Sequence, residues 1–137
     1  MESRLAVPNA ILFVFDPSNK EAIVPQYDPQ NIIAATSSCV SVATLANVDG
    51  DVTARLSHLS SNTHPENLVQ VFNDEIETPG KLLAIVTSRF DTVLKIGVSN
   101  PVTRIAIAVD DPTCPTLVSV NAFLPERVSA TTAQEPA

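Results

Sequence analysis

The sequence predicts an all-β protein, an antiparallel β-sandwich of about eight strands, with jelly-roll and immunoglobulin-like topologies as alternatives. Two observations predict this class: short apolar runs, and turn signals at the spacing found in sandwiches. The runs between Lys81 and Leu124 are rich in Val, Ile and Leu, which suit a pleated, half-buried surface. We expect them to form four consecutive antiparallel strands, a β-meander that makes up the C-terminal half: Leu82–Val86, Val93–Val98, Ile105–Val109 and Leu117–Phe123.

The first predicted strand is Ala10–Phe15, which lacks polar alternation and is therefore expected to be buried on both faces. The segment from Asp16 to Asn31 then holds three prolines among Asp, Asn and Gln residues. Because proline removes a donor from a strand ladder, we expect an ordered loop that packs across a sheet edge, with a short bridge at Ala22–Val24. Loops of this length often carry function, which is the second interpretation.

Ile32–Leu45 is a long segment of apolar and hydroxyl residues, and Thr36-Ser37-Ser38 in its middle predicts either a bulge or two successive strands. Asp49-Gly50 follows. Asp-Gly between strand-like runs predicts a hairpin, because Gly accepts the positive φ of a type I′ turn. The next run alternates apolar with polar side chains, which predicts a strand with one buried face, formed by Val52, Ala54 and Leu56.

Leu68–Phe72 fits two structures. The apolar spacing after Thr63-His64-Pro65-Glu66, which has the form of a capping box, fits a helix, while the β-branched and aromatic residues fit a strand. We favour the strand because the neighbouring segments are strands. Thr78-Pro79-Gly80 indicates a turn. Residues 1–124 are expected to form a single domain, and the polar, proline-containing residues 125–137 a mobile tail.

The net charge of the chain is −7, and it has only 8 Lys and Arg residues. An acidic surface repels phosphate groups, whose neutralisation needs clustered basic residues, so neither nucleic acid nor an anionic membrane is an expected partner. A negative net charge favours a basic protein partner. The alternative explanation is that the charge only keeps the protein soluble. The 3 glycines are too few for phosphate-cradling loops.

The 2 cysteines, Cys39 and Cys114, do not form the dense framework of a small secreted domain. No export signal is evident, because the apolar run Ala10–Phe15 is short and Asp16-Pro17 follows it. No run approaches the length of a membrane span, and the chain has no Asn-x-Ser/Thr sequon. These features predict a bacterial-type cytoplasmic protein.

Residues with metal-binding or catalytic chemistry are few. Neither His58 nor His64 has a partner at the spacing of a known zinc module, and no Gly-x-Ser-x-Gly elbow occurs. His58 continues the buried-face alternation of Leu56 and is expected at the end of that strand. We therefore predict no catalytic residue and no cofactor.

A meander would place successive loops at alternating ends of the sandwich. Three loops would then share one end: Leu59–Asn67, Arg89–Asp91 and Asp110–Pro115. That end would hold Cys114 and the candidate ligands for a hard cation such as calcium, namely His64, Asp91, Asp110 and Asp111. The other end would hold the loops Asp49–Asp51 and Asp74–Glu77. Asp and Asn also favour turns through local backbone hydrogen bonds, which explains the same residues without a ligand.

The segment from Phe72 to Leu82 leads from a strand through a Thr-Pro-Gly turn into the apolar runs, with the sequence Phe72-Asn73-Asp74-Glu75-Ile76-Glu77-Thr78-Pro79-Gly80-Lys81-Leu82. Over Leu68–Phe123 the chain resembles small bacterial all-β proteins of the competence-nuclease-inhibitor and immunity-protein type. In those proteins a strand enters such a turn, and the chain ends as a β-meander. The resemblance implies a non-catalytic protein that binds another protein, and it supplies no site residues.

Three functions remain open. The first is a non-enzymatic binding protein of the inhibitor or immunity type, whose acidic surface binds a basic protein partner. The second is a small-ligand or metal site of the calcium type at one loop end. The third is a self-associating structural subunit, because short strands with few lysines leave sheet edges for a second copy to cover. We expect the first function, in a protein that also forms a homodimer.

Overall fold

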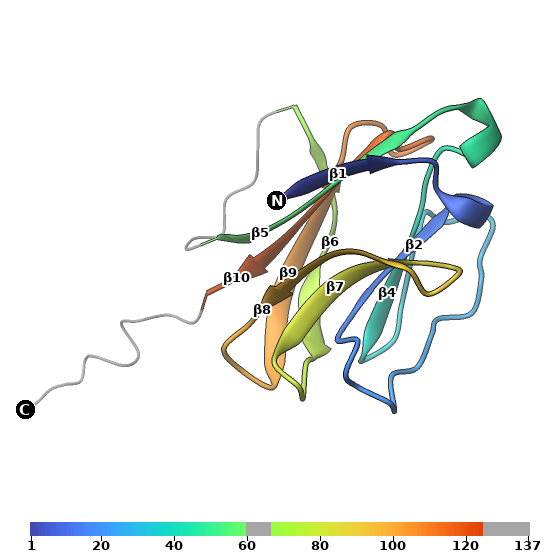
Figure 1. Cartoon of the computed structure of the whole chain (residues 1–137). Helices are drawn as coiled ribbons and strands as arrows, with labels where there is room; N and C mark the ends of the chain where they lie inside the picture. The colour runs from blue at the N-terminus through green and yellow to red at the C-terminus, as the bar shows by residue number, and fades with distance from the viewer. Residues whose placement is uncertain (60–66, 125–137) are drawn as a thin grey trace, which may run out of the picture.

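The computed structural model describes residues 1–59 and 67–124 and shows two five-stranded β-sheets packed as a sandwich (Figure 1). Two short 3-10 turns, η1 (Pro8–Ala10) and η2 (Asn47–Asp49), are the helical elements of this part of the chain. The predicted all-β sandwich is confirmed. Its strands are β1 (Glu2–Leu5), β2 (Ile11–Phe15), β3 (Ile33–Ala35), β4 (Cys39–Ala43), β5 (Val52–Leu59), β6 (Val69–Glu77), β7 (Leu82–Thr87), β8 (Thr92–Gly97), β9 (Val102–Val109) and β10 (Leu117–Phe123).

The two sheets have the strand orders β1-β5-β10-β9-β6 and β3-β4-β2-β7-β8. β5 and β10 run parallel, and the other neighbouring strands run antiparallel. The predicted C-terminal meander forms only in part. β7 pairs with β8 and β9 with β10, but the connections from β6 to β7 and from β8 to β9 cross between the sheets. Periodicity does not reveal which sheet a strand joins, because both sheets bury the same alternation of aliphatic side chains.

Aliphatic side chains from the facing sides of both sheets form the core. Fully burying one such side chain contributes about 1.5–3 kcal/mol. A slip of one residue in any pair would turn these side chains toward water, so burial also fixes the strand register. The largest contributions come from Leu12, Val14, Val40, Val42, Leu56, Ile76, Leu83, Ile85, Ile105, Ile107, Val118 and Val120.

Most strand predictions for the N-terminal half are confirmed. Ile32–Leu45 folds as two strands, β3 and β4, and Leu68–Phe72 enters β6 rather than a helix. No bridge forms at Ala22–Val24, which lies in a loop. β1 is an additional strand whose sequence, Glu-Ser-Arg-Leu, lacks an apolar run.

The prediction of a hairpin at Asp49-Gly50 is wrong. This segment connects β4 in one sheet to β5 in the other, and η2 precedes Gly50. Gly50 has a φ of 143°, a backbone conformation that glycine adopts readily and other residues rarely adopt. The type I′ turn does not form because the flanking strands do not pair with each other.

Predictions for residues 60–66 and 125–137 lie outside the described residues, among them the mobile tail and the position of His64. Within residues 1–59 and 67–124, no helix is long and apolar enough to cross a membrane.

Candidate functional site

Three connections gather at one end of the sandwich: residues 44–51 with η2, the β7–β8 turn at 88–91, and the β9–β10 connection at 110–116. We call these residues the acidic end. The Leu45 N–H donates a hydrogen bond to the Pro115 carbonyl at 2.9 Å. The Asn9 side-chain amide donates to Ser88 Oγ at 2.7 Å, and η1 contacts η2 (Figure 1). Segments distant in sequence therefore form one surface.

Carboxylates outnumber basic groups at the acidic end. Arg4 Nε lies 3.5 Å from Asp51 Oδ2, but both side chains are exposed, and such pairs contribute little to stability. Arg89 is the other arginine near these loops, so the surface is negative at neutral pH. Its exposed acidic residues are Asp49, Asp51, Asp91, Asp110 and Asp111.

Asp110 organises the β9–β10 connection. Its Oδ1 accepts hydrogen bonds from the N–H groups of Asp111, Thr116 and Leu117 at 2.9, 2.9 and 3.0 Å, and its Oδ2 accepts one from the Thr116 hydroxyl. Partial burial alone raises the pKa of Asp110, but these hydrogen bonds, led by that of the Thr116 hydroxyl, together hold the pKa below its ordinary value. The ionised carboxylate therefore fixes the shape of the loop.

Asp111 stabilises the next turn. Its Oδ1 accepts hydrogen bonds from the hydroxyl and the N–H of Thr113, at 2.6 and 2.9 Å. These bonds lower the pKa of Asp111, although the neighbouring charge of Asp110 opposes the shift. Two adjacent carboxylates thus stay ionised together in a loop of fixed shape.

Large apolar side chains are exposed at the same end of the sandwich. Val48 in η2 is 85% exposed, and Phe90 in the β7–β8 turn is 76% exposed. Phe90 also has a φ of 65°, a left-handed conformation that is uncommon for a bulky residue. An exposed aromatic ring held among charged groups is typical of a surface that contacts another protein.

The candidate metal ligands are only partly brought together. Asp91, Asp110 and Asp111 lie at the same end, as predicted, while His64 is outside the described residues. Among the residues described, no group of three or more His, Cys, Asp or Glu side chains is placed to hold a metal ion. Both oxygens of Asp110 already accept hydrogen bonds from its own loop. The calcium-type site stays a prediction.

The prediction that Asp49–Asp51 lies at the opposite end is wrong. This segment joins the acidic end because it crosses between sheets instead of closing a hairpin. Asp74–Glu77 is not a loop but the last part of β6. His58 does lie near the end of β5, yet its ring is exposed, and its Nε2 is 2.7 Å from the Gly97 carbonyl in the other sheet.

The two cysteines differ in their surroundings. Cys39 is fully buried in β4, and burial raises the pKa of its thiol to about 12, which makes it a poor nucleophile. Cys114 is exposed in the β9–β10 connection. Both are free thiols.

Sequence reasoning missed the two exposed apolar residues. The predicted hairpin at Asp49-Gly50 and the predicted loop Arg89–Asp91 do not single out Val48 or Phe90 as exposed apolar residues. A large aromatic side chain in a tight turn was the available signal, because it has no core to enter there.

The chain matches no protein-family model and no curated protein sequence. Among solved structures it is similar to the crystal structure of ComJ, inhibitor of the DNA degrading activity of NucA, from Bacillus subtilis. The TM-score is 0.64 at 13% sequence identity, and the likeness covers 91% of this chain and 96% of the other. The resemblance to competence-nuclease inhibitors that the Thr-Pro-Gly segment indicates is thus confirmed at the level of the fold.

Proposed function

We propose that this protein is a non-enzymatic inhibitor of the immunity type, which binds a basic protein partner through the acidic end. A DNA-degrading nuclease is the class of partner that fits best. The observation that carries the proposal is the arrangement of two exposed apolar side chains, Val48 and Phe90, among five exposed aspartates on one surface.

Electrostatics supports this class of partner. A nuclease holds the DNA backbone with clustered Lys and Arg residues, so its substrate site is basic. Carboxylates facing such a site accelerate association and favour correct partners over incorrect ones. Because Asp110 and Asp111 are held by hydrogen bonds in their own loop, little side-chain entropy is lost when they are covered.

The apolar residues supply a different part of the interaction. Binding energy concentrates in a few desolvated side chains, among which aromatic residues are prominent. Phe90 is presented outward by its turn, and Val48 by η2. We infer that these two side chains anchor the complex, while the aspartates around them orient the partner.

The shared fold supports a protein partner. ComJ is described as an inhibitor of the DNA degrading activity of NucA, and this chain has the same fold over almost its whole length. At 13% identity the contact residues are expected to differ, so the individual nuclease that is bound is expected to differ as well.

The test is inhibition and binding of a purified DNA-degrading nuclease by the native chain, by Phe90→Ala and by the double variant Asp49→Lys/Asp91→Lys. Among the described residues, the side chains of Phe90, Asp49 and Asp91 form no hydrogen bond or ion pair that holds a loop together, so folding is expected to survive. We expect the charge reversals to weaken binding about tenfold or more and to reduce its salt dependence. Phe90→Ala is expected to weaken binding while leaving the salt dependence unchanged.

Glu77→Lys is the matched control, because it reverses an exposed charge at the end of β6, away from the acidic end. Binding that Glu77→Lys and Asp49→Lys/Asp91→Lys weaken equally would contradict the assignment of this surface. A nuclease that is neither bound nor inhibited would overturn the proposed function itself.

A further inference from the structure

Each sheet has two edge strands, β1 and β6 in one sheet and β3 and β8 in the other. In an antiparallel pair, every second residue of an edge strand points its N–H and C=O away from the sheet. Such groups pair readily with another extended chain, and proteins usually block them with charges, bulges or side-chain hydrogen bonds. Devices of this kind block β6, β8 and β1, whereas the outward groups of the three-residue strand β3 carry none of them.

The β6 edge is closed by hydrogen bonds. The Thr78 N–H donates to the Pro101 carbonyl, which sets the register so that Glu75 and Glu77 point their backbone groups outward. The Glu75 N–H donates to Asp74 Oδ1 at 2.7 Å, and the Glu77 N–H donates to the carbonyl of Ser37 at 2.8 Å. A bulge between Gln70 and Phe72 further interrupts this edge.

The β8 and β1 edges are blocked in other ways. On β8 the outward carbonyl of Gly97 lies 2.7 Å from His58 Nε2, which donates because a carbonyl only accepts, and Lys95 occupies another outward position. On β1 the outward positions hold Glu2 and Arg4, which form ion pairs with Arg55 and Asp51. A second chain would have to displace charged groups at either edge.

The β3 edge differs in chemistry. The Thr36 N–H donates to the Cys39 carbonyl and the Ala43 N–H to the Ile32 carbonyl. This register points the N–H and C=O of Ile33 and Ala35 away from β4. Both outward residues are uncharged, and within the described chain these four groups accept or donate no hydrogen bond.

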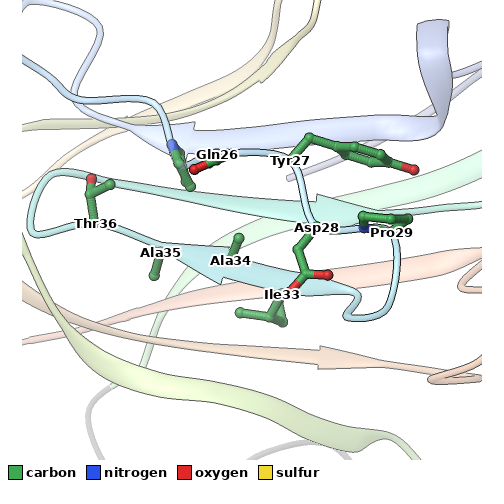
Figure 2. A pocket seen from close by; sticks show the side chains of 9 residues that line it. Gln26, Tyr27, Asp28, Pro29, Ile33, Ala34, Ala35 and Thr36 are labelled. Carbon is green, nitrogen blue, oxygen red and sulfur yellow. The ribbon is translucent and has the colours of Figure 1, made fainter.

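A hollow of about 460 Å³ lies beside this edge. Figure 2 shows Ile33, Ala34 and Ala35 along β3, and Gln26 and Tyr27 on a loop drawn beyond the neighbouring strand, from which Asp28 and Pro29 lead back toward Ile33. Residues 25–29 of this loop line the hollow together with β3 and form its second wall. We call this hollow the β3 groove, which is lined by Pro25, Gln26, Tyr27, Asp28, Pro29, Ile33, Ala34, Ala35 and Thr36.

The loop wall is held in place without a ligand. The Thr36 hydroxyl donates to the Ile23 carbonyl at 2.5 Å, and the Ile23 N–H donates to Ser38 Oγ at 2.8 Å. Pro25 is buried, and Asp28 accepts hydrogen bonds from Gln30 and Asn31 at 2.9 and 2.7 Å. A wall already ordered lowers the entropy that binding must overcome.

The groove has one charge and one exposed ring. Hydrogen bonds from Asn31 and Gln30 lower the pKa of Asp28, so this carboxylate is ionised at neutral pH. Tyr27 is 69% exposed beside it, and no Lys, Arg or His lines the groove. A cationic side chain is therefore the complement of this site, since it pairs with the carboxylate and packs on the aromatic face.

We propose that the β3 groove binds an extended, basic segment of a partner protein, which adds to β3 as a strand. The backbone groups of Ile33 and Ala35 supply the hydrogen bonds, and Asp28 pairs with a Lys or Arg side chain of the segment. This site is distinct from the acidic end, and it holds whether or not the acidic end binds a nuclease.

The probe is a phage-displayed library of random short peptides, followed by a synthetic peptide of the most enriched sequence. We expect enriched sequences that alternate apolar with Lys or Arg residues. Hydrogen exchange of the peptide complex should show protection at the Ile33 and Ala35 amides, and none at Lys95 in β8. A library that yields no binder, or binders that leave both β3 amides unprotected, would overturn the proposal.

Ala35→Pro removes only an outward N–H, because this residue makes no ladder hydrogen bond with β4. Its matched control is Lys95→Pro, which removes an outward N–H from β8. We expect Ala35→Pro and Asp28→Asn each to weaken the peptide about tenfold, and Lys95→Pro and Asp49→Lys to leave it unchanged. Equal binding to Ala35→Pro and the native chain, with both folded by circular dichroism, would disprove strand addition.

Two other occupants are separated by the same variants. Sedimentation of the free protein tests for a dimer. A dimer that Ala35→Pro dissociates would assign the β3 edge to a second copy of the chain and would overturn the partner proposal. The free protein is also compared with a variant that lacks residues 125–137. If the Ile33 and Ala35 amides are protected from hydrogen exchange in the free protein and lose this protection in the variant, the chain's own C-terminus is the occupant, and the proposal again fails.

Discussion

The Gly80 N–H donates a hydrogen bond of 2.6 Å to Oδ2 of Asp16, 64 residues earlier in the chain. Asp16 is completely buried at the end of β2, and its Oδ1 accepts hydrogen bonds from the N–H and the hydroxyl of Ser18. The carboxylate therefore joins the end of β2 to the Thr78-Pro79-Gly80 turn between β6 and β7. Because β6 and β7 belong to different sheets, this turn is one of the places where the chain crosses from one sheet to the other.

We predict that Gly80→Ala destabilises the protein by roughly 1–3 kcal/mol, as overpacking of a filled site does. A Cβ at Gly80 would lie 1.7 Å from Ser18 Oγ and 3.0 Å from Asp16 Oδ2, so the substitution must displace both groups. Urea unfolding measures the change. Gly97→Ala is the control, because the nearest atom to its Cβ is 4.0 Å away. Equal losses for the two variants would show that the close approach at Gly80 does not matter.

The same turn makes a second prediction through Thr78. This buried hydroxyl donates to the Asn100 carbonyl at 2.7 Å and accepts from the Thr103 hydroxyl at 2.8 Å. Thr78→Val keeps the shape but leaves both partners without this contact, at a cost of about 1–3 kcal/mol. Thr78→Ser keeps the hydroxyl and is expected to lose less.

A double-mutant cycle isolates the hydroxyl pair. Once Thr78 is Val, Thr103→Val should cost less than it does in the native protein, because its partner is already gone. Costs that simply add would mean that the two hydroxyls do not interact.

Acid is expected to destabilise the fold through the carboxylates whose pKa the structure lowers, Asp28, Asp110 and Asp111. A carboxylate with a depressed pKa stabilises the folded state above its unfolded pKa, near the ordinary value of 3.8, and this contribution disappears as the pH falls toward the lower folded pKa. The melting temperature should therefore fall as the pH drops below about 4.

Asp110→Asn tests this effect at the most connected of the three. The variant should have a lower melting temperature than the native chain at pH 7. The two melting temperatures should converge in acid, where the native carboxylate is protonated. Curves that stay parallel across the whole pH range would show that Asp110 contributes no pH dependence.

The sequence contained enough to predict the strands but not their partners. Apolar runs such as Ile105–Val109 are too short for a typical helix and therefore predict buried strands. The structure confirms this prediction for Ile105–Val109, which lies in β9. Asp49-Gly50 is compatible with a hairpin turn and with a connection between sheets. Only the packing of β4 and β5 into different sheets selects the connection that is observed. Local pattern is therefore a good guide to elements, while connectivity depends on contacts between residues far apart in sequence.

The candidate site shows the same division. Asp110 and Asp111 could be placed in a loop from the sequence, because Asp favours turns. Asp49 and Val48 lie at the same end only because the β4–β5 connection crosses between the sheets, so the sequence could not place them there. The β3 groove was out of reach as well, because the free backbone groups of Ile33 and Ala35 appear only once the register with β4 is known.

The two thiols are predicted to differ sharply in reactivity. Cys114 is exposed, whereas Cys39 is buried with a pKa raised to about 12, and the reactive species is the thiolate. Near pH 8 a thiol reagent should modify one cysteine per chain rapidly and the second only when the fold opens. Cys114→Ser should abolish the rapid phase, and Cys39→Ser should leave it intact. If Cys39 instead reacts as fast as Cys114 in the absence of denaturant, β4 must open readily, and the packing around it is looser than the structure indicates.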